Sequence, residues 1–252
     1  MSMSRHLKCG LLGEKLGHSL SPSLHKELGS YEYKLYEKSR DEALDFLRFG
    51  DYDVLNVTVP YKELAFSICD ECSLLCKELK NSNLVVKDRA SGKLHGYNSD
   101  FEGFKCLLDG IDVAGTICII LGTGGASKTV NCVLKHLGAA KVIHVSRNPS
   151  KDGEIGYQEL PGIVSTTSLI VNATPVGMFP RTTETPLELG LLEKCSSTKL
   201  LAVVDLIYNP RPTKFLAHAA SLGFKAIDGM KMLARQAELS SIFMNGSFCG
   251  LC

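Results

Sequence analysis

An apolar run, a cluster of glycines and an amphipathic segment follow one another between residues 116 and 138. This succession constrains the fold more than any other feature of the chain. The run reads TICIIL, the cluster GTGGAS and the segment after it KTVNCVLKHLG. One side of the last segment carries apolar side chains, namely Ala126, Val130, Val133, Leu134 and Leu137, as in a helix packed on a sheet. The stretch therefore predicts a buried strand, a tight turn and a helix, which together open a nucleotide-binding unit.

The glycines of this turn suit a phosphate group. Gly122, Gly124 and Gly125 let the backbone turn sharply and approach a pyrophosphate closely. The following helix offers free N–H groups and a partial positive charge at its first turn. Ser127 stands where a third glycine is usual, and a small residue is compatible with helix–strand packing there.

The next strand predicts which dinucleotide is bound. An NAD site places Asp or Glu at the end of this strand for the ribose hydroxyls, but the chain reads VSRNPSK. Arg147 and Lys151 flank the place of a 2′-phosphate, although Asp152 follows directly. Two cations without a carboxylate favour NADP; the alternative is a basic turn that is merely solvated.

Strand-like and helix-like segments alternate along the whole chain, which predicts an α/β fold. SLIVNATP and LLAVVDLIY are fully apolar runs of the kind buried in parallel sheets. We expect an N-terminal α/β domain over residues 1–102, to which 229–252 returns, and a Rossmann-type domain over 103–228. A cleft between the two domains would hold the substrate.

Local signals within the N-terminal part predict individual elements. SPSLHKELG is expected to be a helix capped by Ser21, with Gly29 just past its end. Ser39 and Glu42 form a capping box for another helix. Residues 61–80 are expected to be one helix, and 83–98 a hairpin that turns at residues 91–92.

Composition excludes several classes of function. The net charge of +1 does not favour nucleic acid or an anionic membrane. The N-terminus lacks an apolar leader and no run approaches a membrane span, so we expect a cytoplasmic enzyme with reduced cysteines. The Cys69/Cys72 and Cys249/Cys252 pairs have metal-binding or redox spacing, but Cys69, Cys72 and Cys76 would share a helix face as small buried side chains. The seven histidines show no metal-ligand cluster, and no metal is expected.

A nicotinamide cofactor implies hydride transfer at a carbinol carbon, which needs a proton donor and acceptor for the oxygen. Lys62 follows the strand-like stretch LNVTVP, and Asp100 lies at a turn before a helix. Alone, the lysine would be interpreted as a surface cation and the aspartate as a helix cap. Together in a nucleotide-dependent enzyme they are acid–base candidates.

Eight motifs in order make the chain similar to the shikimate dehydrogenase family. They are GHSLSPSLH, NVTVPYK, NSD, GTGGAS, SRNPSK, NATPVGM, DLIYNPRPT and DGMKMLARQA. The resemblance implies NADP-dependent, reversible reduction of 3-dehydroshikimate to shikimate, a step of chorismate and aromatic amino acid biosynthesis. It implies a small-molecule substrate bound by the N-terminal domain, and a monomer or homodimer.

The resemblance also implies a role for each matching residue. Lys62 would exchange a proton with the 3-oxygen, and Asp100 would position it. The expected substrate ligands are Ser19, Ser21, Thr58, Asn83, Tyr208 and Gln236. The expected NADP contacts are Gly122, Thr123, Gly124, Gly125, Ala126, Ser127, Ser146, Arg147, Lys151, Thr174, Ile207 and Gly229.

Some positions depart from the family pattern and leave alternatives open. Glu14 stands where the first motif usually has proline, with Lys15 beside it, and the N-terminal domain is shorter than usual. A quinate/shikimate dehydrogenase with relaxed substrate or cofactor use is the nearest alternative. A methylenetetrahydrofolate dehydrogenase would not need the serine and Asn-x-Asp motifs, and a silent NADP-binding regulator would not need Lys62 and Asp100.

Overall fold

A computed structural model describes residues 6–17, 19–150, 153–195 and 198–246 of the chain. The chain divides into two compact units. One comprises residues 1–102 and 234–252, and the other comprises residues 103–233. Among the described residues, no helix has the length and apolar character needed to cross a membrane.

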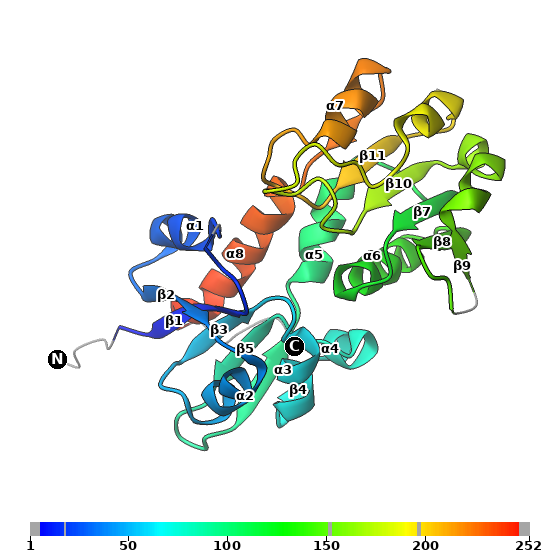
Figure 1. Cartoon of the computed structure of the whole chain (residues 1–252). Coiled ribbons are helices and arrows are strands. Elements are labelled where there is room, and N and C mark those ends of the chain that lie inside the picture. Colours follow the sequence, from blue (N-terminus) through cyan, green and yellow to red (C-terminus); the bar gives the residue numbers. More distant parts are fainter. Residues whose placement is uncertain (1–5, 18, 151–152, 196–197, 247–252) are drawn as a thin grey trace. The chain divides into compact units, whose positions relative to one another are not determined.

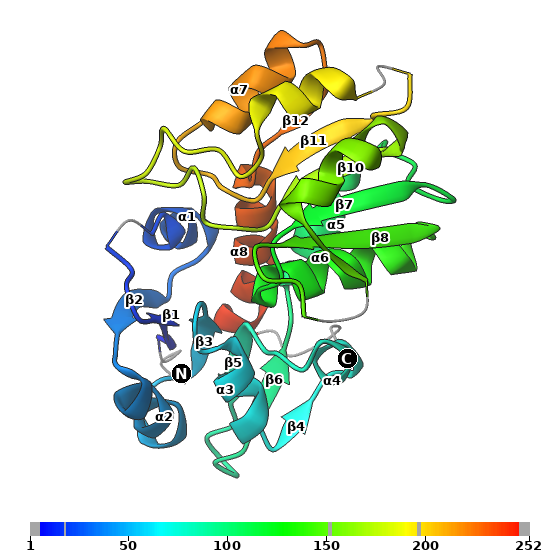
Figure 2. The ribbon, with the colours of Figure 1, turned by 45° about the vertical axis from the view of Figure 1, so that its right-hand side comes forward.

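The second unit is built on a six-stranded sheet in the order β12-β11-β10-β7-β8-β9. Every neighbouring pair in it is parallel, and Figure 2 shows β8, β7, β10 and β11 side by side. Counted from β7, this is the 3-2-1-4-5-6 order of doubly wound dinucleotide-binding folds. The predicted Rossmann-type architecture is therefore confirmed, and the carboxyl ends of β7 and β10 meet where such folds bind ligands.

The first unit carries a mixed six-stranded sheet in the order β2-β1-β3-β5-β6-β4 (Figure 1). Strands β1, β2 and β3 are parallel, whereas β5 runs antiparallel to both β3 and β6. The hairpin predicted over 83–98 is this β5–β6 pair, and Gly92 in its turn has a φ of +74°. The carboxyl end of β3 leads directly into the segment that carries Lys62.

The elements of the first unit follow the expected alternation. They are β1 (Lys8–Gly13), α1 (Ser21–Leu28), β2 (Glu32–Glu37), α2 (Arg40–Phe49), β3 (Val54–Val57), α3 (Lys62–Ile68), β4 (Glu71–Cys72), α4 (Leu74–Leu79), β5 (Leu84–Lys87), β6 (Leu94–Tyr97) and the start of α5 (Asp100–Lys105). The last helix, α8 (Met230–Met244), begins in the second unit and ends in the first.

The second unit contributes the remaining elements. They are a 3₁₀ turn (Cys106–Leu108), β7 (Ile117–Leu121), α6 (Gly125–His136), β8 (Lys141–Ser146), β9 (Glu154–Gly156), three 3₁₀ segments (Tyr157–Gly162, Val164–Thr166, Leu189–Lys194), β10 (Leu169–Asn172), β11 (Ala202–Asp205), α7 (Lys214–Ser221) and β12 (Ala226–Ile227). β9 and the 3₁₀ segments have no counterpart among the sequence predictions.

The single helix expected over residues 61–80 is wrong. Helix α3 ends at Ile68, β4 follows, and α4 begins at Leu74. The interruption arises because β4 pairs with β6. Beside this pairing, the Asp70 N–H donates to the Leu94 carbonyl, and the Asp70 carboxylate accepts the Leu94 N–H. Sheet pairing here outweighs a helical apolar pattern, so Cys69, Cys72 and Cys76 lie on three different segments instead of one helix face.

The two predicted helix starts have different outcomes. Ser39 caps α2, and both its N–H (2.8 Å) and its hydroxyl (2.6 Å) donate to the Glu42 carboxylate, so the capping box is confirmed. Ser21, expected as a cap, is instead the first residue of α1, and Leu20 occupies the cap position. The Ser21 side chain therefore does not cap α1.

Candidate functional site

Lys62 and Asp100 form an ion pair, and each is the first residue of its helix, α3 and α5. The Lys62 Nζ lies 2.6 Å from Asp100 Oδ2, and their side chains are 20% and 6% exposed. Gln236 of α8 donates its side-chain N–H to the other oxygen, Asp100 Oδ1. Both carboxylate oxygens are thus engaged, and the Lys62 ammonium is held with part of its surface open.

Asn83, directly before β5, fixes the turn that presents Asp100. Its Oδ1 accepts the backbone N–H of Ser99 at 2.7 Å, and its Nδ2 donates to the Ser99 hydroxyl at 3.1 Å. Its carbonyl accepts the N–H of Val57 at 2.8 Å. Asn83 is 4% exposed, so it ties the end of β3 to the Asp100 turn.

Thr58 directly follows β3, and its carbonyl accepts the N–H of Tyr61 at 2.9 Å. A cis peptide joins Val59 to Pro60, and the tyrosine is buried with its hydroxyl donating to the Lys38 carbonyl at 2.6 Å. Strand, turn and helix therefore place Lys62 one turn beyond the strand end.

Ser19 and Ser21 meet at the start of α1, where the Ser21 N–H donates to the Ser19 hydroxyl at 3.3 Å. Burial raises the pKa of the hydroxyl of Tyr33 in β2, and the Ser21 side chain opposes this shift. The Tyr33 hydroxyl donates to Asn56 of β3 at 3.0 Å. The contacts described for the two serines do not join them directly to Lys62.

The glycine loop between β7 and α6 leaves space for a ligand. A Cβ on Gly124 or Gly125 would meet nothing within 4 Å. Gly124 occupies the N-cap position of α6, where no side chain caps the helix. By contrast, Gly122 has a φ of +105°, and a Cβ there would lie 2.8 Å from Thr174 Cγ2. The space beside Gly124 and Gly125 at the start of α6 is therefore open, as a phosphate site at a helix start requires.

The remaining loop residues divide into exposed and buried ones. Thr123 is exposed and Ala126 partly exposed. Ser127 is 1% exposed, and its hydroxyl donates to the Gly124 carbonyl at 2.7 Å. The buried Ser127 side chain thus fixes the loop backbone at Gly124.

At the end of β8, the hydroxyl of Ser146 accepts the N–H of Asn148 at 3.2 Å. Arg147 is exposed and makes no ion pair with a described residue. The Glu154 carboxylate accepts the N–H of Ser150 at 2.9 Å in the same turn. Lys151, the second predicted cation, lies outside the described residues.

Thr174, Ile207 and Gly229 follow the carboxyl ends of neighbouring strands in the second unit. Ile207 is 5% exposed, and its carbonyl accepts the N–H of Gly229 at 3.1 Å. A Cβ on Gly229 would collide with the Leu206 carbonyl oxygen, so only glycine fits there. Tyr208 follows Ile207, and burial raises the pKa of its hydroxyl.

Sequence reasoning missed the polar residues beneath these positions. Asn172 and Asp205 end β10 and β11 opposite one another, and both are completely buried. The signal was a polar residue inside each of two apolar runs, SLIVNATP and LLAVVDLIY. A buried carboxylate in such a run needs several donors, which marks it as part of a network.

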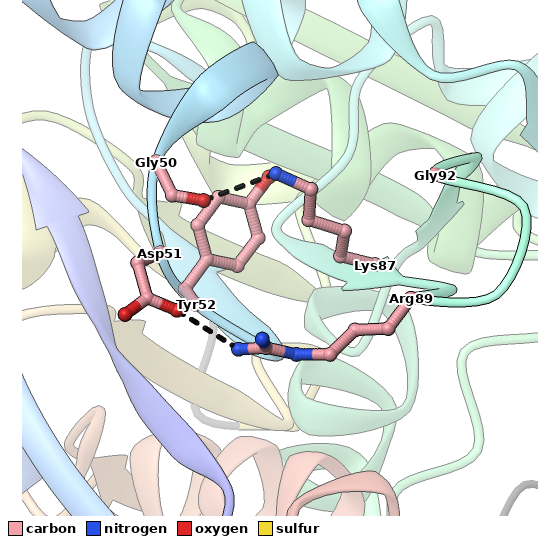
Figure 3. Close-up of a pocket in the computed structure, with 6 residues that line it drawn as sticks. All are labelled: Gly50, Asp51, Tyr52, Lys87, Arg89 and Gly92. Carbon is pink, nitrogen blue, oxygen red and sulfur yellow. Dashed lines mark hydrogen bonds and ion pairs between the residues drawn. The ribbon is translucent and has the colours of Figure 1, made fainter.

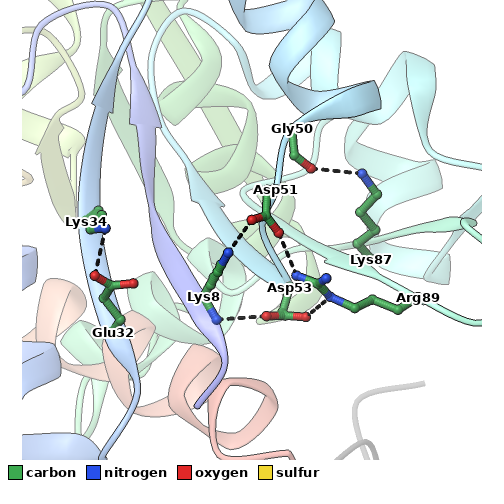
Figure 4. Close-up of polar contacts among 8 residues, drawn as sticks. All are labelled: Lys8, Glu32, Lys34, Gly50, Asp51, Asp53, Lys87 and Arg89. Atoms are coloured by element: carbon green, nitrogen blue, oxygen red, sulfur yellow. Dashed lines mark hydrogen bonds and ion pairs between the residues drawn. The ribbon is translucent and has the colours of Figure 1, made fainter. Parts of the chain in front are cut away.

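A pocket of about 210 Å³ lies in the first unit, lined by Gly50, Asp51, Tyr52, Lys87, Arg89 and Gly92 (Figure 3). Its cations are engaged: Lys87 donates to the Gly50 carbonyl, while Arg89 pairs with Asp51 and Asp53 (Figure 4). Residues 50–52 precede β3, whereas Thr58 and Lys62 follow it. The pocket therefore lies at the opposite end of β3 from Lys62 and Asp100.

The clustered cysteines are packing residues in their described surroundings. The sulfurs of Cys69 and Cys72 approach Gly96 of β6, where an added Cβ would lie 3.1 and 3.0 Å from them. Burial raises the pKa of the Cys69 thiol, and it raises that of Cys76 to about 11. Cys249 and Cys252 lie outside the described residues.

Comparison with known proteins identifies the family. Residues 11–85 match the model of the shikimate dehydrogenase substrate binding domain. A shikimate dehydrogenase (NADP(+)) from Halothermothrix orenii is 34% identical over 257 residues, covering 90% of this chain and 87% of that protein. The chain belongs to the shikimate dehydrogenase family.

Solved structures of shikimate dehydrogenases have the same fold. Shikimate dehydrogenase 1 from Peptoclostridium difficile is 34% identical with a TM-score of 0.85, covering 96% of this chain and 92% of that one. The Thermus thermophilus shikimate 5-dehydrogenase, solved in complex with NADP(H) and shikimate, is 28% identical with a TM-score of 0.80 and covers 95% and 94%.

Proposed function

We propose that this chain is an NADP-dependent shikimate dehydrogenase that reversibly reduces 3-dehydroshikimate to shikimate. The observation that carries the proposal is the Lys62–Asp100 ion pair, braced by Gln236, within a chain of this family. The pair combines a proton donor with a carboxylate that holds it in place. A serine pair and an asparagine-bound turn on the same unit add neutral hydrogen-bonding groups suited to a polyhydroxylated acid.

The chain's own residues would handle the proton. When bound, the reduced cofactor would supply hydride for the C3 carbonyl carbon. In this reductive direction the Lys62 ammonium would give its proton to the C3 oxygen. In the oxidative direction neutral Lys62 accepts the C3 hydroxyl proton. Asp100 and Gln236 keep the amine in place, Ser19, Ser21 and Tyr208 would bind the carboxylate, and Thr58 and Asn83 would bind ring hydroxyls.

The second unit would hold NADP. The open space over Gly124 and Gly125 fits a pyrophosphate at the start of α6. Thr123, Ala126, Ser146, Thr174, Ile207 and Gly229 would line the rest of that site. Exposed Arg147, without an ion-pair partner among described residues, suits the 2′-phosphate.

An activity screen tests the proposal. Purified protein is given shikimate or quinate, each with NADP⁺ or NAD⁺, and the absorbance of the reduced nicotinamide is followed. We expect the largest kcat/KM for shikimate with NADP⁺. Turnover of quinate alone would favour the quinate dehydrogenase alternative, and no turnover of either would refute the proposed activity.

Arg147 offers a separate test of cofactor choice. Arg147→Ala should weaken NADP⁺ binding by about tenfold or more, because a charge-assisted contact with the 2′-phosphate is lost. NAD⁺ binding should change less than twofold. Equal losses for both cofactors would contradict the role assigned to Arg147.

A further inference from the structure

Asp205 is a buried carboxylate that no expected contact with substrate or cofactor explains. It is completely buried at the end of β11, and three neutral donors converge on it. The Asn172 amide (2.9 Å) and the Ile207 N–H (3.1 Å) donate to Oδ1, and the Thr213 hydroxyl (2.8 Å) donates to Oδ2. Burial raises the pKa of Asp205 to about 6, and the hydrogen bonds from these three donors oppose that rise by favouring the ionised form.

The network continues through Asn172 into the loop after β10. Asn172 Oδ1 accepts both the backbone N–H (3.0 Å) and the hydroxyl (2.7 Å) of Thr174. The Thr174 oxygen in turn accepts the N–H of Val176 at 3.2 Å. The direction of the Thr174 side chain is therefore set by an amide that Asp205 holds.

Four segments expected to contact NADP adjoin this arrangement. Thr174 packs on Gly122, the first glycine of the phosphate loop. Ile207 donates its N–H to Asp205 and accepts that of Gly229. The loops after β10 and β11 and the segment before α8 thus connect to one buried carboxylate through hydrogen bonds. The loop after β7 adjoins this network through the packing of Thr174 on Gly122.

We propose that Asp205 is a positioning residue for NADP: through Asn172 and Ile207 it fixes the backbone and side chains that line the cofactor site. It acts without touching the cofactor. The inference rests on the proposed function, since it assumes that Thr174, Ile207 and Gly229 contact NADP.

The test measures binding of NADP⁺ and of shikimate separately by calorimetry, in the full chain and without turnover. Asp205→Ala removes all three acceptor contacts and should raise the Kd for NADP⁺ at least tenfold. Asp205→Asn is the matched control. Its amide oxygen can accept from Asn172 and Ile207 while its NH₂ donates to the Thr213 hydroxyl, so NADP⁺ binding should stay within threefold of wild type.

The Kd for shikimate separates positioning from general damage. It should change less than twofold in Asp205→Ala, because most expected shikimate ligands lie in the other unit. If Asp205→Ala does not fold, Thr213→Val replaces it, with Thr213→Ser as its control. The valine variant should bind NADP⁺ at least threefold more weakly, and the serine variant should match wild type.

Several results would overturn the inference. The first is an unchanged Kd for NADP⁺ in Asp205→Ala, or in Thr213→Val where that variant replaces it. The second is an equal rise of this Kd in Asp205→Asn and Asp205→Ala. The third is an equal loss of affinity for shikimate and for NADP⁺. Wild-type protein that binds neither NADP⁺ nor NAD⁺ would refute the proposed function itself, and the inference with it.

Discussion

Lys62 depends on residues distant in sequence for its position. Asp100 binds its ammonium, and Gln236, 136 positions further along the chain, binds the second oxygen of Asp100. A lysine held this way has lost most of its side-chain freedom before a substrate arrives. Part of the entropic cost of orienting a proton donor is thereby met by the fold.

Replacing Lys62 tests its chemistry directly. Lys62→Ala should lower kcat by roughly 10²–10⁴-fold, because the proton donor is lost. The Kd for NADP⁺, measured by calorimetry, should remain within twofold, since the cofactor residues lie in the other unit. A rise in the KM for shikimate with unchanged kcat would make Lys62 a binding residue and contradict the acid–base role.

His25 is a buried histidine in α1 whose environment controls its charge. Its ring stacks on Tyr33 with centroids 4.0 Å apart, and its Nδ1 lies 2.6 Å from the Tyr31 hydroxyl. Burial lowers the pKa of His25 to about 4, and a side-chain hydrogen bond to Asn56 opposes this shift. The folded protein therefore keeps this ring neutral where an unfolded chain would protonate it.

The sign of the resulting pH dependence follows from linkage. Because the folded pKa is lowered, the stabilising contribution is complete above the unfolded value near 6.5 and is lost as the pH falls toward 4. Wild type should lose roughly 3 kcal/mol through this residue over that range. His25→Gln should lose correspondingly less, as measured by urea unfolding followed by tyrosine fluorescence. Parallel profiles for the two proteins would show that His25 is not the group responsible.

Most elements could be predicted from the sequence, because apolar periodicity and glycine turns are local signals. The strand–loop–helix of β7 and α6, the α2 capping box and the β5–β6 hairpin are examples. The break between α3 and α4 could not, because it depends on pairing between β4 and the distant β6. No local pattern encodes a partner strand more than twenty residues away.

The C-cap of α4 carries a strain that a single substitution can relieve. Lys80 has a φ of +52°, in the left-handed region where a β-carbon is unfavourable. Lys80→Gly should raise the free energy of unfolding by roughly 0.5–1 kcal/mol, after the entropy of glycine in the unfolded chain is counted. Lys80→Ala keeps the β-carbon and should leave stability unchanged within error. Equal effects of the two variants in urea unfolding would assign the gain to the lost charge instead.

At the scale of the whole molecule, the motifs that carry the chemistry could be predicted from the sequence. The buried polar residues that hold them in position could not. Lys62 and Asp100 were nominated by type and by family resemblance, and their contact follows from the structure. Asn172 and Asp205 lie in runs that indicate only buried strands. Their roles depend on strand order, which places β10 beside β11, and single-sequence patterns do not specify that order.

The reactivity of the buried cysteine thiols can report the unfolding of each unit. Cys9 and Cys76 lie in the first unit, and Cys118 and Cys195 in the second; all four are buried, free, and raised in pKa by burial. An alkylating reagent can reach each of these thiols only when the unit that contains it unfolds. In rising urea, mass spectrometry of alkylated peptides should show the two thiols within each unit becoming reactive together. The urea concentration at which each pair of thiols becomes reactive would rank the two units by stability, without any substitution in the chain.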